Sequence, residues 1–175
     1  MSAENDNVAQ GSPFWRFSLG FYRQSGVGDV CVALQDTCGV DVNLLLFLLW
    51  RASAKNRLLA SDVKQIDEKM RGWRDLTVIP LRAMRRKLKD HAPFVAAGSV
   101  EVFRTRIKAA ELEAERLQQE TLYELVNSTK LGVDDASAED AARANMAAYQ
   151  TALAREFPRG AVDILLGALR KAGHV

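Results

Sequence analysis

Seven consecutive large apolar residues run from Leu44 to Trp50, with Asp41 shortly before them and Arg51 directly after them. A surface helix keeps one polar side, whereas this run covers the full circumference of a helix. The run is far shorter than the roughly 20 residues that a membrane-spanning helix needs. Asp41 can accept a backbone N–H of the first turn, as an N-cap does. The pattern therefore predicts a buried central helix at about 42–56.

Amphipathic helices are predicted on both sides of this run. Ser12 with Pro13 is typical of a helix start, and Gly39 is typical of the residue that follows a helix end. Ser61, Ser99 and Ser137 are the predicted caps of later helices, in which apolar residues recur every three to four positions. The predicted helices lie at about 13–25, 30–38, 42–56, 62–73, 76–88, 99–127, 137–157 and 161–171.

Seven or eight helices without a convincing strand predict an all-α fold: a single-domain bundle around the buried central helix. A length of 175 residues fits one domain. Within it we expect a disordered N-terminal tail at 1–12 and a helical core domain at 13–127. The turn-rich residues 128–136 are the predicted linker to a C-terminal helical pair, 137–175, packed on the core.

The net charge, the cysteines and the N-terminus indicate the cellular compartment of the protein. The formal net charge is only +2, so no strong field draws the whole chain towards nucleic acid or acidic lipid. Cys31 and Cys38 lie about 10 Å apart along one predicted helix, too far for a disulfide, which indicates free thiols in a reducing compartment. The polar N-terminus lacks the apolar segment of a secretory signal. We therefore expect a cytoplasmic protein with no membrane span.

The chain offers few residues for metal or catalytic chemistry. His91 and His174 are its two histidines, and no spacing of His, Cys or Glu matches a zinc or di-iron motif. No glycine-rich phosphate loop follows a predicted strand. A nucleophile would have little more than His91 as its base. We predict no metal, no cofactor and no catalytic residues, and favour a protein that is not an enzyme.

A basic segment holds five positive charges and no negative one: Arg82, Arg85, Arg86, Lys87 and Lys89. If helices 76–88 and 99–127 form an antiparallel hairpin, Arg82 lies near Glu111 and Arg74 near Glu115. The charges would then pair within the chain. Alternatively, Arg82, Arg85, Arg86 and Lys89 form a binding patch for a protein partner or, with weaker support because no aromatic residues interleave with them, for RNA or DNA.

A second candidate site lies at the start of the central helix. Asp41 and Asn43 are either structural residues or the polar rim of a pocket, where the helix dipole favours an anion. The ligand, anionic or amphipathic, would be bound by Asp41, Asn43, Trp50, Arg74, Glu111 and Glu115.

Several local phrases together resemble one family. These are Phe14-Trp15-Arg16-Phe17-Ser18, Ala33-Leu34-Gln35-Asp36, Asp41-Val42-Asn43-Leu44-Leu45-Leu46-Phe47 with Trp50, Trp73-Arg74, Pro80-Leu81-Arg82 and Ala109-Ala110-Glu111-Leu112-Glu113-Ala114-Glu115. Over roughly residues 13–125 the chain resembles a family of small, helical proteobacterial proteins of unknown function. The resemblance implies a cytoplasmic bacterial origin and a single helical domain. It assigns no activity and no site residues.

Two functional hypotheses follow. The first is a non-enzymatic interaction or adaptor module for a macromolecular partner, which would bind the basic face at Arg82–Lys89 or the apolar side of helix 161–171. The second is a small-molecule-binding protein or enzyme that uses the pocket at the start of the central helix.

Overall fold

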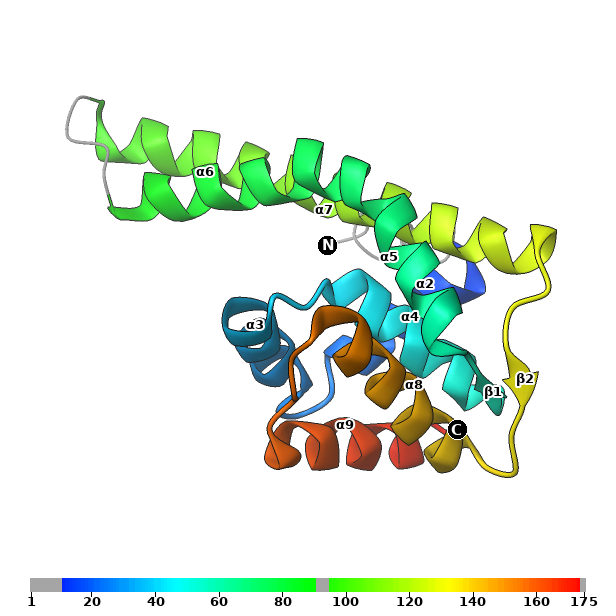
Figure 1. Cartoon of the computed structure of the whole chain (residues 1–175). Helices are drawn as coiled ribbons and strands as arrows, with labels where there is room; N and C mark the ends of the chain where they lie inside the picture. The colour runs from blue at the N-terminus through cyan, green and yellow to red at the C-terminus, as the bar shows by residue number, and fades with distance from the viewer. Residues whose placement is uncertain (1–10, 91–94, 174–175) are drawn as a thin grey trace. The chain divides into compact units, whose positions relative to one another are not determined.

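The computed structural model describes residues 11–90 and 95–173, so His91 and His174 lie outside the described residues. Helices dominate it, and the predicted all-α class is confirmed (Figure 1). In chain order the elements are α2 (Pro13–Tyr22), α3 (Val27–Cys38), α4 (Val42–Ser53), β1 (Asn56–Arg57), α5 (Ala60–Trp73), the π-helix η1 (Arg74–Val78), α6 (Ile79–Asp90), α7 (Ala97–Ser128), β2 (Val133–Asp134), α8 (Ala138–Leu153) and α9 (Arg159–Ala172).

The chain forms two compact units. Unit 1 comprises Met1–Asp67 and Gln119–Val175, and unit 2 comprises Glu68–Gln118. The boundaries fall within α5 and α7, which therefore contribute residues to both units. The predicted linker at 128–136 lies inside unit 1, and the predicted division of the chain at that point stays a prediction.

Helix α4 is the buried centre of unit 1, as predicted. Every residue from Leu44 to Leu49 is buried, and only Trp50 of the apolar run is partly exposed. Helices α2 and α8 pack directly against α4. Because the run has no polar side, burial on all sides removes the largest possible apolar area from water, at about 25 cal/mol per Å².

The predicted end of this helix at about 56 is wrong, because α4 ends at Ser53. Lys55 adopts a left-handed backbone conformation with φ of 57°, which breaks the helical path. The chain then enters β1, so Asn56 belongs to a strand.

The short sheet is a second correction, because no strand was predicted. Strands β1 and β2 pair antiparallel, with Asn56 opposite Asp134 and Arg57 opposite Val133. Two residues per strand carry no recognisable alternation of polar and apolar positions. Their pairing depends instead on contacts between segments that are distant in the sequence.

Some of the predicted helix ends are confirmed and others are wrong. Ser12 and Ser137 are N-caps that accept backbone N–H bonds from Trp15 and Asp140, and Gly39 follows α3 with φ of 71°. Ser61 and Ser99 are not caps, because α5 begins at Ala60 and α7 at Ala97, with Gly98 inside the helix. At α5 the Asp62 carboxylate accepts the Leu59 N–H, and at α7 the first bonds go to the Ala96 carbonyl.

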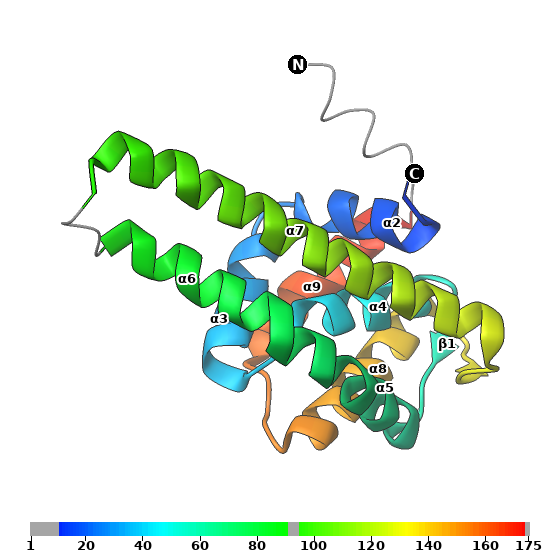
Figure 2. The same ribbon diagram turned by 90° about the horizontal axis from the view of Figure 1, so that it is seen from above.

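In unit 2, α5 continues through η1 into α6, and α6 lies beside α7 in both views of the fold (Figures 1 and 2). Pro80 stands in the first turn of α6. It has no N–H for the carbonyl one turn earlier, and the wider turn of η1 directly precedes it. The predicted antiparallel hairpin is confirmed by contacts between its helices: Arg82 Nε of α6 donates to Glu111 Oε1 of α7 at 3.1 Å. Trp73, the last residue of α5, also contacts α7, because its Nε1 donates to the Ala114 carbonyl at 2.9 Å.

Helices α8 and α9 complete unit 1. Helix α9 packs against α3 and α8, and Leu165, Leu166 and Leu169 are buried. The apolar side of the predicted helix 161–171 therefore packs in the core of unit 1, and its use as a partner surface stays a prediction. Helix α8 ends at Leu153, earlier than the predicted 157, because Ala154 adopts a left-handed conformation with φ of 50°.

Candidate functional site

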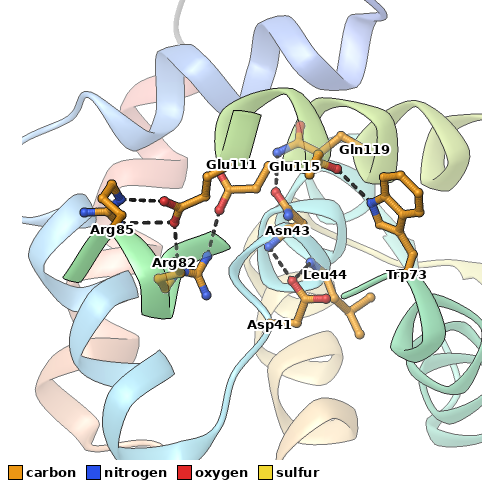
Figure 3. A network of polar contacts seen from close by, with 10 residues as sticks. Asp41, Asn43, Leu44, Trp73, Arg82, Arg85, Glu111, Glu115 and Gln119 are labelled. Carbon is orange, nitrogen blue, oxygen red and sulfur yellow. Dashed lines mark hydrogen bonds and ion pairs between the residues drawn. The ribbon is translucent and has the colours of Figure 1, made fainter. Parts of the chain in front are cut away.

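The start of α4 is a capped helix end. Asp41 Oδ1 accepts the backbone N–H of Asn43 at 2.9 Å and that of Leu44 at 3.5 Å (Figure 3). The backbone N–H of Asp41 in turn donates to the hydroxyl of Tyr149, at 2.8 Å, which is fully buried on α8. The Asp41 carboxylate thus satisfies the N–H groups that a bound anion would otherwise use.

Asn43 is also held within unit 1. It is buried, and its Oδ1 accepts a hydrogen bond from Gln119 Nε2 at 2.8 Å. Because Gln119 is itself buried on α7, this bond ties the first turn of α4 to the unit 1 part of α7. The structural interpretation of Asp41 and Asn43 explains these contacts without a ligand.

Trp50 belongs to an aromatic cluster. Its ring centroid lies 5.3 Å from Phe14, 6.0 Å from Phe47 and 5.8 Å from Tyr123. Offset and tilted ring pairs at these separations contribute about 0.5–1.5 kcal/mol each beyond their area burial. Trp50 therefore fills space between α2, α4 and α7.

The arginines of α6 turn towards α7. Arg82 Nε lies 3.1 Å from Glu111 Oε1, and Arg82 Nη2 lies 2.7 Å from Glu115 Oε1 (Figure 3). Arg85 donates to both oxygens of Glu111, at 2.5 and 3.1 Å. The hydrogen bond to Glu111 raises the pKa of the Arg85 guanidinium. The predicted proximity of Arg82 and Glu111 is confirmed.

The ion pairs with Glu111 and Glu115 separate the basic residues of α6 into two groups. Arg82 and Arg85 pair with acidic residues of the same unit, whereas Arg86, Lys87 and Lys89 have exposed side chains. A carboxylate such as Glu111, which is only 5% exposed, needs the two guanidinium groups because a buried unpaired charge is costly. Arg82 and Arg85 therefore bind α7, and partner binding by Arg82, Arg85, Arg86 and Lys89 stays a prediction.

With its arginines turned inward, α6 carries an open apolar groove. A pocket of about 330 Å³ is lined by Pro80, Ala83, Met84, Lys87 and Leu88. Met84 is 44% exposed, and Leu76 in the preceding turn is 76% exposed. This groove was not predicted from the sequence, although the spacing of Pro80, Ala83, Met84 and Leu88 places these residues on one side of a helix.

The residues of the predicted ligand pocket come from both units. Asp41, Asn43 and Trp50 lie on or next to α4, whereas Arg74 lies in η1 and Glu111 and Glu115 lie on α7. Their contacts within each unit are structural, and the ligand pocket itself stays a prediction.

Two further features concern the part of the chain that the structure describes. No three His, Cys, Asp or Glu side chains gather there as metal ligands. No helix among those residues is both long enough and apolar enough to cross a membrane.

Cys31 and Cys38 are free, and burial raises the pKa of the Cys31 thiol to about 12, which keeps it protonated and unreactive.

Comparison with known proteins identifies the family. No curated protein and no solved structure matches the chain. A family described as "protein of unknown function (DUF2390)" matches residues 13–122, which include α2 to α6 and most of α7. Because the match spans more than half of the chain, the chain belongs to this family of proteins of unknown function.

Proposed function

We propose that this chain is a non-enzymatic interaction module whose α6 groove holds an acidic amphipathic segment of a partner protein. The observation that carries the proposal is the orientation of α6. Its two pairing arginines point to α7, and Met84 and Leu88 line an open groove beside Lys87. Apolar side chains left open in a groove are the usual contact for the apolar side of a partner helix.

Charge complementarity argues for an acidic partner. Residues 82–108 contain eight Lys and Arg residues against two Asp and Glu residues. Within the described segments, Lys87, Lys89, Arg106 and Lys108 form no ion pair, and all four side chains are exposed. An acidic partner would therefore gain attraction from charges that the hairpin does not use itself.

A protein segment fits the groove better than a nucleic acid does. Among the residues that the structure describes, the groove lining contains no aromatic side chain on which a base could stack. Phosphates would use the lysines but would gain nothing from Met84, Ala83 and Leu88. An amphipathic acidic helix uses both kinds of side chain.

The test is a binding titration followed by fluorescence anisotropy. The probe is a labelled helical peptide with leucines on one side and glutamates on the other. We expect saturable binding that weakens as salt rises, and Met84→Glu to weaken it about tenfold, because the substitution places a charge in the groove. The matched control is Leu112→Glu on α7, where the side chain is exposed to a similar extent, 50%.

The outcomes are distinct. Equal loss in Met84→Glu and Leu112→Glu would contradict the groove as the site. Binding of a single-stranded RNA oligonucleotide in preference to the peptide would replace the acidic protein partner with a nucleic acid. A charge control, Lys87→Glu compared with Lys64→Glu in unit 1, should weaken peptide binding only for Lys87.

A further inference from the structure

A pocket in unit 1 contains an arginine that has no acidic partner among the described residues, next to buried amide side chains held by hydrogen bonds. We propose that this pocket binds a small molecule through a phosphate or carboxylate group held by Arg51. The pocket has a volume of about 390 Å³ and lies between the end of α4 and the segment that leads into β2. Polar residues in its lining are Arg51, Asn56, Thr129, Lys130 and Asp134, and Gly132 also lines it.

Arg51 is a half-buried cation. Its Nε donates to Asn56 Oδ1 at 3.2 Å, and its guanidinium carbon lies 5.8 Å from the centroid of the Trp50 ring. Among the described residues, no carboxylate lies within ion-pair distance of Arg51. Burial accordingly lowers the pKa of this guanidinium, because desolvation disfavours the charged form.

An anion would supply the missing counter-charge. An arginine has five N–H donors, and the bond to Asn56 uses the one on Nε. The terminal nitrogens keep their planar fork, which matches two oxygens of a carboxylate or phosphate. Bonds of this kind to a charged partner are stronger than neutral ones and restore the solvation that Arg51 loses by burial.

The floor of the pocket is fixed by buried amides. Asn56 is 8% exposed, and its Nδ2 donates to the Val133 carbonyl at 3.4 Å. Asn145 on α8 is fully buried, and its Nδ2 donates to the Asn56 carbonyl at 3.1 Å and to the Leu48 carbonyl at 2.9 Å. Asn56 therefore holds the Arg51 side chain in one orientation, as a preformed site requires.

The loop opposite Arg51 is equally constrained. Gly132 has φ of 71°, and a Cβ atom there would lie 2.5 Å from the Arg57 carbonyl oxygen and 2.7 Å from Asn56 Oδ1. Only glycine fits this close approach. The bond from the Asp135 N–H to the Lys55 carbonyl, 2.7 Å long, holds the far end of the loop. Thr129 and Lys130 are thereby kept at the rim of the pocket.

The charge and size of the pocket define the ligand class. Arg51 and Lys130 outweigh Asp134, whereas the neighbouring Asp135 pairs with Arg57 at 3.7 Å. The pocket therefore has one excess positive charge. Its volume lies in the range of small-molecule sites, about 300–1,000 Å³. A small organic phosphate or carboxylate meets both conditions.

The test is a titration of the full ¹⁵N-labelled chain with inorganic phosphate and, separately, with acetate, at constant ionic strength. We expect saturable shifts of the Lys130, Leu131 and Gly132 amide signals with at least one of the two ions, and no saturable shift at Lys87. Arg51→Gln should weaken the binding about tenfold or more, and Lys130→Gln severalfold. Lys64→Gln, an exposed lysine of the same unit, should leave it unchanged.

The results distinguish a phosphate ligand from a carboxylate ligand, and they also show whether the proposal is wrong. Saturation with phosphate alone assigns the site to a phosphate group, and saturation with acetate alone or with both ions assigns it to a carboxylate-sized oxyanion. Shifts that stay linear with both ions, or that persist in Arg51→Gln, would overturn the proposal. If Arg51→Gln loses its helical circular dichroism, Lys130→Gln decides, and unchanged affinity in that variant would also overturn it.

Discussion

The two units of the chain use opposite means to hold helices together. In unit 1, α4 is buried on every side by apolar contacts, and polar groups at its ends serve as caps. In unit 2, α6 contacts α7 through Arg82, Arg85 and Glu111, while apolar Leu76 and Met84 are exposed. The apolar run of α4 is therefore covered within the chain, whereas α6 and the turn before it leave apolar side chains exposed.

The two units also differ in net charge. Unit 2 has twelve Lys and Arg against seven Asp and Glu, a net charge of +5, and unit 1 has twelve against fifteen, a net charge of −3. The net charge of +2 for the whole chain hides this contrast. Each unit therefore has its own electrostatic preference, and the positive charge of unit 2 favours acidic partners.

The largest effect is expected in the core of unit 1. Phe47→Ala should lower the free energy of unfolding by about 3–5 kcal/mol, because it removes a fully buried ring and leaves a cavity. Urea denaturation followed by circular dichroism measures the loss. Leu76→Ala in unit 2 is the control, and a loss within about 0.5 kcal/mol is expected there because that side chain is 76% exposed.

The ion-pair cluster of unit 2 should give the second largest effect. Glu111→Gln should cost about 1–3 kcal/mol, less than for a fully buried pair, because Arg82 and Arg85 retain contact with water. Hydrogen exchange of the α6 amides measures the loss locally. Glu113→Gln removes an exposed pair with Arg116 and should change exchange little; equal effects of the two variants would contradict the role of Glu111.

The N-cap of α4 should give a smaller effect. Asp41→Ala should lower stability by about 1 kcal/mol, because the N–H groups of Asn43 and Leu44 lose their acceptor. Asp41→Asn keeps an acceptor oxygen, so this variant should lower stability by only a few tenths of 1 kcal/mol. Thermal unfolding of the two variants tests this order, and a larger loss for the Asn variant would argue that Asp41 acts through its charge.

The smallest effect concerns an exposed cluster between α8 and α9. Hydrogen bonds from Arg170 and Arg143 lower the pKa of Glu139 to about 2. Because the pKa is lower in the folded state, the ionised carboxylate stabilises the fold above about pH 4.5, and this contribution is lost as the pH falls towards 2. Carboxyl NMR titration should find a midpoint near 2 that rises in Arg170→Met. An unchanged midpoint in that variant would show that Arg170 is not the cause.

Much of the fold could be predicted because its signals are local in the sequence. The apolar run of α4, the caps Asp41 and Ser12, and Gly39 at the end of α3 each depend on a few neighbouring residues. The contact between Arg82 and Glu111 followed from one geometric assumption, the antiparallel hairpin.

The features that sequence analysis missed depend on distant contacts. The Arg51 pocket needs Asn56, Lys130 and Asn145, which lie in three separate segments, and no local motif links them. The early end of α4 arises from the turn at Lys55 and the pairing of β1 with β2. The start of α7 at Ala97 was missed because Gly98 and Ser99 suggested a cap, whereas the helix runs through both and its first backbone bonds go to the Ala96 carbonyl.

The docking proposal depends on α6 turning its arginines inward and its apolar side chains outward. Thiol labelling tests this directly, with Met84→Cys and Leu45→Cys each made in a background in which Cys38 is replaced by serine. We expect the thiol at position 84 to react nearly as fast as a free thiol, whereas the thiol at position 45 should react only when unit 1 unfolds. Equal protection at the two positions would contradict the open groove.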